Sequence, residues 1–169
     1  MFVPFNPAAL ANRANVRAPS GGGTSYVTGD RTASITVTTS VGLLDGGTAS
    51  NFVDGGFGDN STDSTFFPSG SPSTSGVFIK FDFGTGKVVD EAKWYQDTSA
   101  SHGDWKWQGS NDDSSYTDIG SSFTLGGATT QTQTTLNGNI TSYRYYQLLG
   151  VSGNLSGSPW LREIEFKQN

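Results

Sequence analysis

Hydrophobic and polar side chains alternate along most of the chain after Thr32. The alternation is clearest in GVFIKFDFG, whose apolar side chains are Val77, Ile79, Phe81 and Phe83. Successive side chains of a strand point to opposite faces, so this run predicts a half-buried strand with its apolar face inside. Ile35 and Val37 alternate with Ser and Thr in the same way within TASITVTTS.

Tryptophans follow the same period of two. Trp94 shares a face with Ala92 in DEAKWYQD, and Trp105 shares one with Trp107 in DWKWQGS. Aromatic faces also suit sugar rings, but this placement favours the core for all three tryptophans. Further candidate strands are SYTDI, SFTL, TQTQTTL, SYRYYQLLGV and WLREIEF. Eight or more short strands separated by turn residues predict an all-β sandwich or jelly roll.

A polar run, GSNDDSS, separates the Trp107 strand from the next candidate strand. Asn and Asp tolerate a left-handed backbone and bond their own main chain, which suits a tight connection between antiparallel strands. The sequence therefore predicts a hairpin tip here.

Composition narrows the class of protein. The 169 residues suit one domain, and 23 glycines with only 15% charged residues favour strands and turns over helices. The net charge is −5 and the ten Lys and Arg are scattered, so no nucleic-acid partner is expected. The absence of cysteine excludes disulfides and thiolate chemistry. No window reaches the about 20 apolar residues of a membrane span, so no membrane insertion is expected.

The first 25 residues differ from the rest. Asn6 and Pro7 could begin a short alanine-rich helix, and SGGGTS would end it as a flexible joint. Two interpretations stay open: a cloning remnant or frayed tail, and an arm that docks on a protein partner. The predicted organisation is an N-terminal arm over residues 1–25 and a sandwich over residues 26–169.

The order of these segments resembles the discoidin, or coagulation-factor C-type, domain of the galactose-binding-like superfamily. The similar segments are SITVTTSVGLLDGGTASNF, GVFIKFDFGTGKVVDEAKWY, WKWQGSNDDSSYTDI, SYRYYQLLGVSG and SPWLREIEFKQN. The first contains that family's Asp-Gly loop, and the third is similar to its hairpin. The resemblance runs from Asp30 to Lys167 and implies a discoidin-like jelly-roll β-sandwich.

Many domains of this family hold a structural calcium ion, which prefers about 6 to 8 hard oxygen ligands. The resemblance implies as ligands Asp45, the carbonyl of Gly47, Ser50 and Glu163. The alternative is that Asp45 only caps a tight turn and that Glu163 is a solvated charge.

The family binds ligands in loops at one end of the sandwich, and residues 54–75 form a long loop, of the kind that tends to be functional. Aromatic residues off the strands, with a neighbouring His and a carboxylate, would suit a sugar there. The predicted ligand-binding residues are Phe57, Phe66, Phe67, His102, Asp104 and Trp160. Two alternatives stay open: His102 as a plain loop residue, and Trp160 as a plug under the sandwich.

Signatures of catalysis are absent from the sequence. It has no Gly-x-Ser-x-Gly elbow, phosphate loop, zinc cluster or dinucleotide fingerprint. The leading hypothesis is a non-catalytic carbohydrate-binding or adhesion module that contacts host glycans from a virus or phage particle, or from an extracellular surface. The alternative is a structural or decoration protein of a large assembly such as a phage virion, anchored by residues 1–25 and without sugar binding. The N-terminus lacks the pattern of a secretory signal, which suits a virion protein.

Overall fold

The computed structural model describes residues 25–169, so all but the last residue of the predicted arm lies outside the described residues. The strands are β1 (Tyr26–Val27), β2 (Thr36–Thr39), β3 (Phe78–Lys87), β4 (Val89–Gln96), β5 (Ser101–Ser110), β6 (Thr117–Gly126), β7 (Thr130–Gln133), β8 (Tyr143–Ser152) and β9 (Leu161–Gln168). Two short 3-10 helices are η1 (Ala49–Phe52) and η2 (Thr134–Leu136). The prediction of an all-β chain is confirmed.

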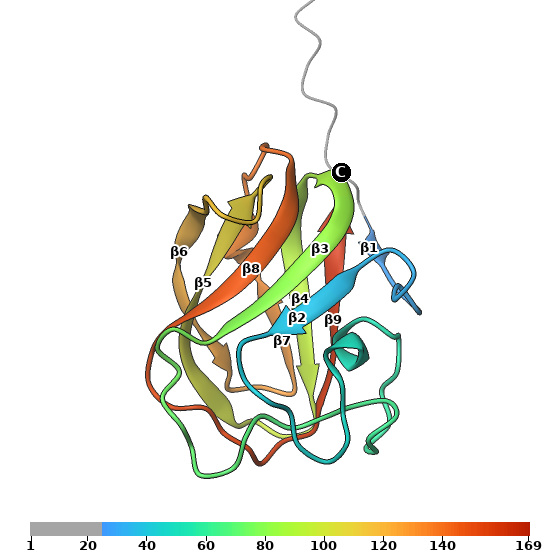
Figure 1. Ribbon diagram of the computed structural model, residues 1–169, viewed down its shortest axis with the longest axis vertical. Coiled ribbons are helices and arrows are strands. Elements are labelled where there is room, and N and C mark those ends of the chain that lie inside the picture. The colour runs from blue at the N-terminus through green and yellow to red at the C-terminus, as the bar shows by residue number, and fades with distance from the viewer. Residues whose placement is uncertain (1–24) are drawn as a thin grey trace, which may run out of the picture.

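Two antiparallel sheets face one another (Figure 1). One has the strand order β1-β9-β4-β7, and the other has the order β2-β3-β8-β5-β6. Neighbours in each sheet are mostly distant in sequence, as in β3 beside β8 and β4 beside β9. This arrangement is a β-sandwich with long crossing connections.

The core lies between the sheets and contains the residues that the alternation placed there. Phe81, Trp94, Trp105 and Trp107 are completely buried. The Phe81 ring packs against Trp107 of β5 and against Phe166 of β9, with centroids 6.2 and 5.0 Å apart. The predicted core is therefore confirmed, and its aromatic rings join the two sheets.

The polar run between β5 and β6 is a hairpin tip, as predicted. The Asp112 carboxylate accepts backbone hydrogen bonds from Ser114 and Ser115, at 2.9 and 2.8 Å, and these bonds lower its pKa. Asp113 takes the left-handed conformation with φ 58°. The two short strands predicted after this turn form one strand, β6, which continues through Gly120.

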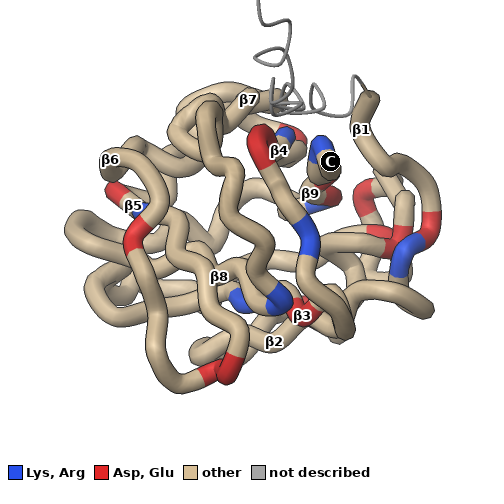
Figure 2. The backbone as a smooth tube through the Cα atoms, turned by 90° about the horizontal axis from the view of Figure 1, so that it is seen from above, with Lys and Arg blue, Asp and Glu red and all other residues tan. Residues whose placement is uncertain are grey.

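Loops of different lengths gather at the end of the sandwich away from the C-terminus (Figure 1). They comprise residues 40–77, 97–100 and 153–160. Basic positions lie among acidic ones over the described part of the chain and form no continuous stripe (Figure 2). Within residues 25–169, no helix has the length and apolarity needed to cross a bilayer.

Replacing Phe81 with Ala should lower the free energy of unfolding by about 3 to 5 kcal/mol, because the cavity would lie between Trp107 and Phe166. Urea unfolding followed by fluorescence measures the change. Val151→Ala is the control, since Val151 is 42% exposed and should change stability by less than about 0.5 kcal/mol. Equal effects of the two substitutions would contradict this description of the core.

Candidate ligand-binding site

An isolated backbone bridge ties the long loop to the start of β9. The Thr65 N–H donates to the Leu161 carbonyl at 3.0 Å, and the Leu161 N–H donates to the Thr65 carbonyl at 2.6 Å. Residues beside an antiparallel bridge face one another, so Phe66 lies opposite Trp160. This bridge brings together two of the predicted ligand-binding residues.

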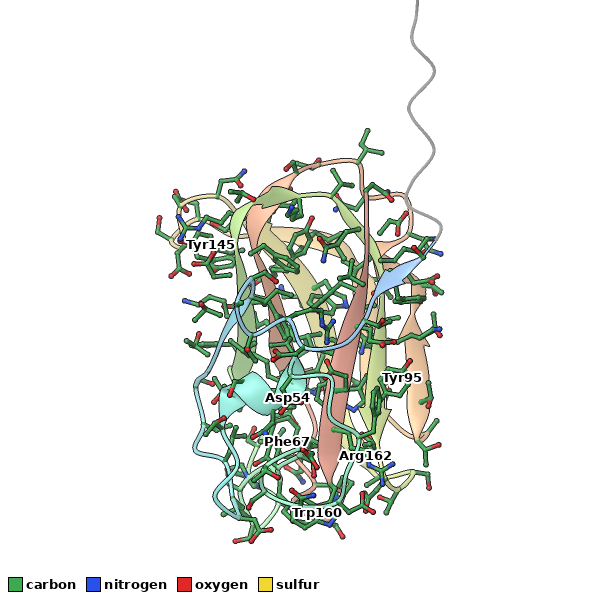
Figure 3. The ribbon with its side chains drawn as sticks, turned by 90° about the vertical axis from the view of Figure 1, so that its right-hand side faces the viewer. Asp54, Phe67, Tyr95, Tyr145, Trp160 and Arg162 are labelled. Atoms are coloured by element: carbon green, nitrogen blue, oxygen red, sulfur yellow. The ribbon has the colours of Figure 1, made fainter. Side chains whose placement is uncertain are left out.

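Phe66 and Trp160 form a closely packed, tilted pair, which we call the aromatic platform. Their ring centroids are 4.1 Å apart and their planes are tilted by 36°. Both side chains are half-buried, so each leaves part of its surface open. Trp160 lies at the loop end of the sandwich (Figure 3). An open aromatic surface of this kind can stack on the apolar face of a sugar ring.

Asp97 forms hydrogen bonds with the backbone of Trp160, one of the two residues of the aromatic platform. Its carboxylate accepts a hydrogen bond from the Trp160 N–H at 2.7 Å, and its own N–H donates to the Trp160 carbonyl at 3.0 Å. Both backbone groups of Trp160 are bonded to the same residue, which fixes the main chain at this position, and the indole then packs against Phe66.

Phe67 points the opposite way from Phe66 and is completely buried. Its ring stacks near Trp94 and Trp105, with centroids 6.4 and 6.2 Å away. The prediction that Phe67 lies on an exposed rim therefore fails, because alternation along the chain sends one of two adjacent phenylalanines into the core.

His102 is also completely buried, in a hydrogen-bonded network rather than on the surface. The Gln96 side-chain oxygen accepts from the Trp94 indole at 2.7 Å and lies 3.0 Å from His102 Nε2. The Gln96 amide nitrogen donates to the carbonyls of Thr98 and Ala100. Neither the sugar-binding role nor the plain loop role predicted for His102 fits this position.

The contacts of His102 define its tautomer. The Ser156 N–H can only donate, and it donates to Nδ1 at 3.4 Å. The proton therefore sits on Nε2, which donates to Gln96. Burial lowers the pKa of His102 to about 4. The imidazole is neutral at physiological pH, and its role is to join β4, β5 and the loop before β9.

Phe57 and Asp104 do not join the aromatic platform. Phe57 is 47% exposed and packs edge-on against Tyr95 of β4, with ring centroids 5.1 Å apart. The Asp104 carboxylate accepts hydrogen bonds from Thr124 and Ser152, and these bonds lower its pKa. The predicted single rim thus divides into a platform, a separate Phe57–Tyr95 pair and a polar cluster on β5.

Sequence reasoning missed three residues around the loop end. Tyr95 alternates with Trp94 and could have been assigned to the outer face by the same period of two. Asp97 directly follows β4, where a carboxylate often bonds to a neighbouring loop. Arg162 forms an ion pair with Asp59 of the long loop, and no local sequence pattern predicts that contact. Figure 3 shows Tyr95, Trp160 and Arg162 on the same side of the molecule.

The predicted calcium ligands do not fit a metal site that uses Glu163. Glu163 Oε1 accepts from the Arg31 guanidinium and, at 3.1 Å, from the Ile164 N–H. Oε2 accepts from the Gly55 N–H at 2.6 Å. A divalent cation at this carboxylate would be repelled by Arg31, and both oxygens already have donors.

The remaining predicted ligands lie in a turn. Asp45 is exposed with φ 60°, and the Gly47 N–H donates to the Leu44 carbonyl at 3.2 Å. The Ser50 hydroxyl lies 2.6 Å from that of Thr48. Among residues 25–169, no group of three or more His, Cys, Asp or Glu side chains is arranged to hold a metal ion.

The Arg31–Glu163 pair holds several segments together. Both side chains are almost completely buried. Arg31 also donates to the carbonyls of Val27 and Gly29, each at 3.1 Å. Burial raises the pKa of Glu163 above its ordinary value, and the Arg31 charge and the Gly55 N–H oppose this rise. The pair connects the chain after β1, the long loop and β9.

Solved structures share this architecture. The family 32 carbohydrate-binding module of C. perfringens NanJ, in complex with galactose, aligns with a TM-score of 0.59 at 14% identity, covering 82% of this chain and 97% of that one. The corresponding module of AlyQ, in complex with 4,5-unsaturated mannuronic acid, gives a TM-score of 0.55 at 23% identity, covering 78% and 92%. The lectin domain of lectinolysin, complexed with Lewis B antigen, gives 0.57 at 17% identity, covering 85% and 99%.

These similarities establish the fold, which is the discoidin or galactose-binding-like β-sandwich. The resemblance found in the sequence is therefore confirmed at the level of fold. No protein-family model matches the chain, and no curated protein matches it.

Acid should weaken the fold through His102, the only histidine of the chain. Its pKa is about 4 in the folded state, against about 6.5 in an unfolded chain. The unfolded state therefore binds more protons between these values, and stability should fall as pH decreases from about 6.5 to about 4, by up to about 3 kcal/mol.

His102→Gln is the matched variant for this measurement. The substitution removes the titration of the imidazole. The carboxylates titrate in both proteins, so their effect cancels in the comparison. Urea unfolding at a series of pH values should show a gap between wild type and variant that narrows as pH falls. A gap independent of pH would refute the assigned neutral imidazole.

Replacing Arg31 with Ala should lower the free energy of unfolding by about 3 to 5 kcal/mol, because Glu163 would remain buried without its partner. Arg162→Ala is the control: its partner Asp59 is exposed, so the loss should stay below about 1 kcal/mol.

Thermal melts with and without EDTA test the calcium hypothesis on the wild type and on both variants. We expect EDTA to leave the wild-type melting temperature unchanged, and a decrease of several degrees would restore the calcium hypothesis.

Proposed function

We propose that this protein is a non-catalytic carbohydrate-binding module that uses the aromatic platform of Phe66 and Trp160. The observation that carries the proposal is the packed pair of rings, which is half-buried at the loop end and whose Trp160 backbone is bonded to Asp97. A sugar ring would stack on the exposed aromatic surface, and polar groups of the neighbouring loops would bind its hydroxyls.

Two further features support this proposal. The fold is shared with carbohydrate-binding modules and a lectin domain, several of which hold sugars in their structures. The platform also lies on loops that the sandwich holds in place, because Phe67 is inserted into the core directly beside Phe66. A preformed platform loses little conformational freedom on binding.

The setting of the module is a separate part of the proposal. A virus or phage particle, or another extracellular surface, would present the platform to host glycans. A protein partner bound through residues 1–25 would anchor it there. Calcium is not part of the proposal, because Glu163 is already bonded to Arg31.

Titration of tryptophan fluorescence can test the platform directly. The chain has four tryptophans, and Trp94, Trp105 and Trp107 are completely buried, so a surface ligand should act mainly on Trp160. Galactose and chitosan oligomers are suitable probes. At least one should change the emission, with saturation in the micromolar to millimolar range.

Trp160→Ala and Tyr145→Ala form a matched pair for calorimetric titration with the same probes. Tyr145 is a half-buried aromatic residue at the opposite end of the sandwich (Figure 3). Losing the stacking surface should weaken binding about tenfold or more in Trp160→Ala, while Tyr145→Ala should bind like wild type. If the wild type binds none of the probes, or both variants bind as the wild type does, the platform is not a sugar site.

A further inference from the structure

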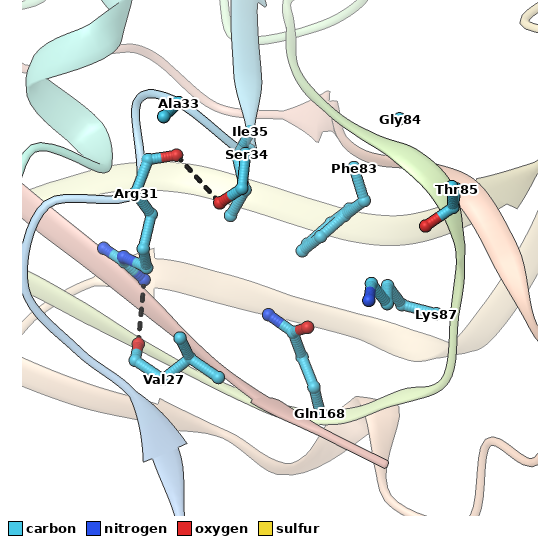
Figure 4. A pocket seen from close by; sticks show the side chains of 10 residues that line it. All are labelled: Val27, Arg31, Ala33, Ser34, Ile35, Phe83, Gly84, Thr85, Lys87 and Gln168. Carbon is cyan, nitrogen blue, oxygen red and sulfur yellow. Dashed lines mark hydrogen bonds between the residues drawn. The ribbon is translucent and has the colours of Figure 1, made fainter.

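A pocket opens at the other end of the molecule from the aromatic platform, between the edges of the two sheets. Its volume is about 380 Å³, within the range of small-molecule sites. It is lined by Val27, Arg31, Ala33, Ser34, Ile35, Phe83, Gly84, Thr85, Lys87 and Gln168. These residues come from β1, the segment before β2, the end of β3 and the end of β9, near the C-terminus (Figures 1 and 4).

The inner wall of the pocket is apolar and belongs to the core. Ile35 is 3% exposed and Phe83 is 6% exposed. The Phe83 ring packs edge-on against Tyr146 and Phe166, with centroids 5.6 and 5.2 Å away. A ligand would therefore meet a rigid apolar surface.

An irregularity in β3 brings polar side chains to this wall. The register between β3 and β8 shifts between Asp82 and Lys87, and Gly84 has φ 70° within the shift. Extra residues in one strand redirect the side chains that follow, and such bulges are common beside binding sites. Thr85 and Lys87 reach the pocket in this way (Figure 4).

Three polar groups of the pocket have no partner within residues 25–169. The Lys87 ammonium makes no ion pair or hydrogen bond there, and neither the Thr85 hydroxyl nor the Gln168 amide makes a hydrogen bond there. No Asp or Glu of the described chain lines the pocket. The other lining cation, Arg31, is neutralised by Glu163. The pocket thus offers one uncompensated positive charge beside an amide and a hydroxyl.

We propose that this pocket binds the carboxylate-bearing ring of a uronic acid. The Lys87 ammonium would pair with the carboxylate, Gln168 and Thr85 would bond to ring hydroxyls, and the small exposed part of Phe83 would contact an apolar part of the sugar. This site is separate from the aromatic platform and does not depend on the proposed function.

The residues before Ser25 are poor candidates for the same place. Residues 1–24 contain no Asp or Glu, so they offer no side-chain carboxylate to Lys87. Residues 1–24 therefore offer no charge-matched occupant for the pocket.

The test is a nuclear magnetic resonance titration of the full-length protein with D-glucuronate and, in parallel, with D-glucose. The two sugars differ only in the carboxylate. Glucuronate should shift the backbone amides of Thr85, Lys87 and Gln168 and bind about three- to fivefold tighter than glucose, as expected for one partly solvated ion pair. Added salt should reduce the difference.

Lys87→Gln should bind glucuronate no better than glucose. Lys93→Gln is the matched control, because the Lys93 ammonium lies over the Tyr26 ring and outside the pocket. Trp160→Ala should retain the glucuronate shifts, which separates this site from the platform. Equal affinity for both sugars, or unchanged glucuronate binding in Lys87→Gln, would overturn the proposal. An absence of shifts at the three amides would overturn it as well, whatever the cause, including occupation of the pocket by residues 1–24.

Discussion

The insertion of Phe67 between the two tryptophan-bearing strands is the contact on which the loop end depends. Its ring lies against Trp94 of β4 and Trp105 of β5, which belong to different sheets. The long loop is thereby fixed to the core near its middle. Because adjacent side chains point to opposite sides, burying Phe67 turns Phe66 outward, where Trp160 covers one face of its ring.

Buried polar groups also attach these loops to the sandwich, through hydrogen bonds and an ion pair. The Gln96 side chain satisfies Trp94, His102 and two loop carbonyls in a buried position. Unpaired polar groups in such a site would cost free energy, so the network favours one arrangement of the loops. Arg31 and Glu163 do the same on the other side of the sandwich, where they join the chain after β1 to the long loop and β9.

The sandwich has two ends with different chemistry. The loop end presents an aromatic pair held by Asp97, which suits a neutral sugar face. The other end presents a pocket whose charge comes from Lys87 and whose wall is Phe83. Irregular backbone creates both features, through an isolated bridge at Thr65 in one case and a shifted register in β3 in the other. Regular strands supply the rigid frame, and its irregular edges supply the binding groups.

The sequence by itself determined the strands, the buried tryptophans and the β5–β6 hairpin, because alternation and turn chemistry are local properties of neighbouring residues. The order of segments also indicated the fold. The sequence also named Phe66 and Trp160 as candidates, but only the tertiary structure decided that these two pair and that Phe67 and His102 are buried. Arg31 meets Glu163 across 132 positions, and His102 is covered by Phe67 of the long loop and by Ser156 of the loop before β9. Such contacts depend on which strands become neighbours, and no short-range pattern carries that information.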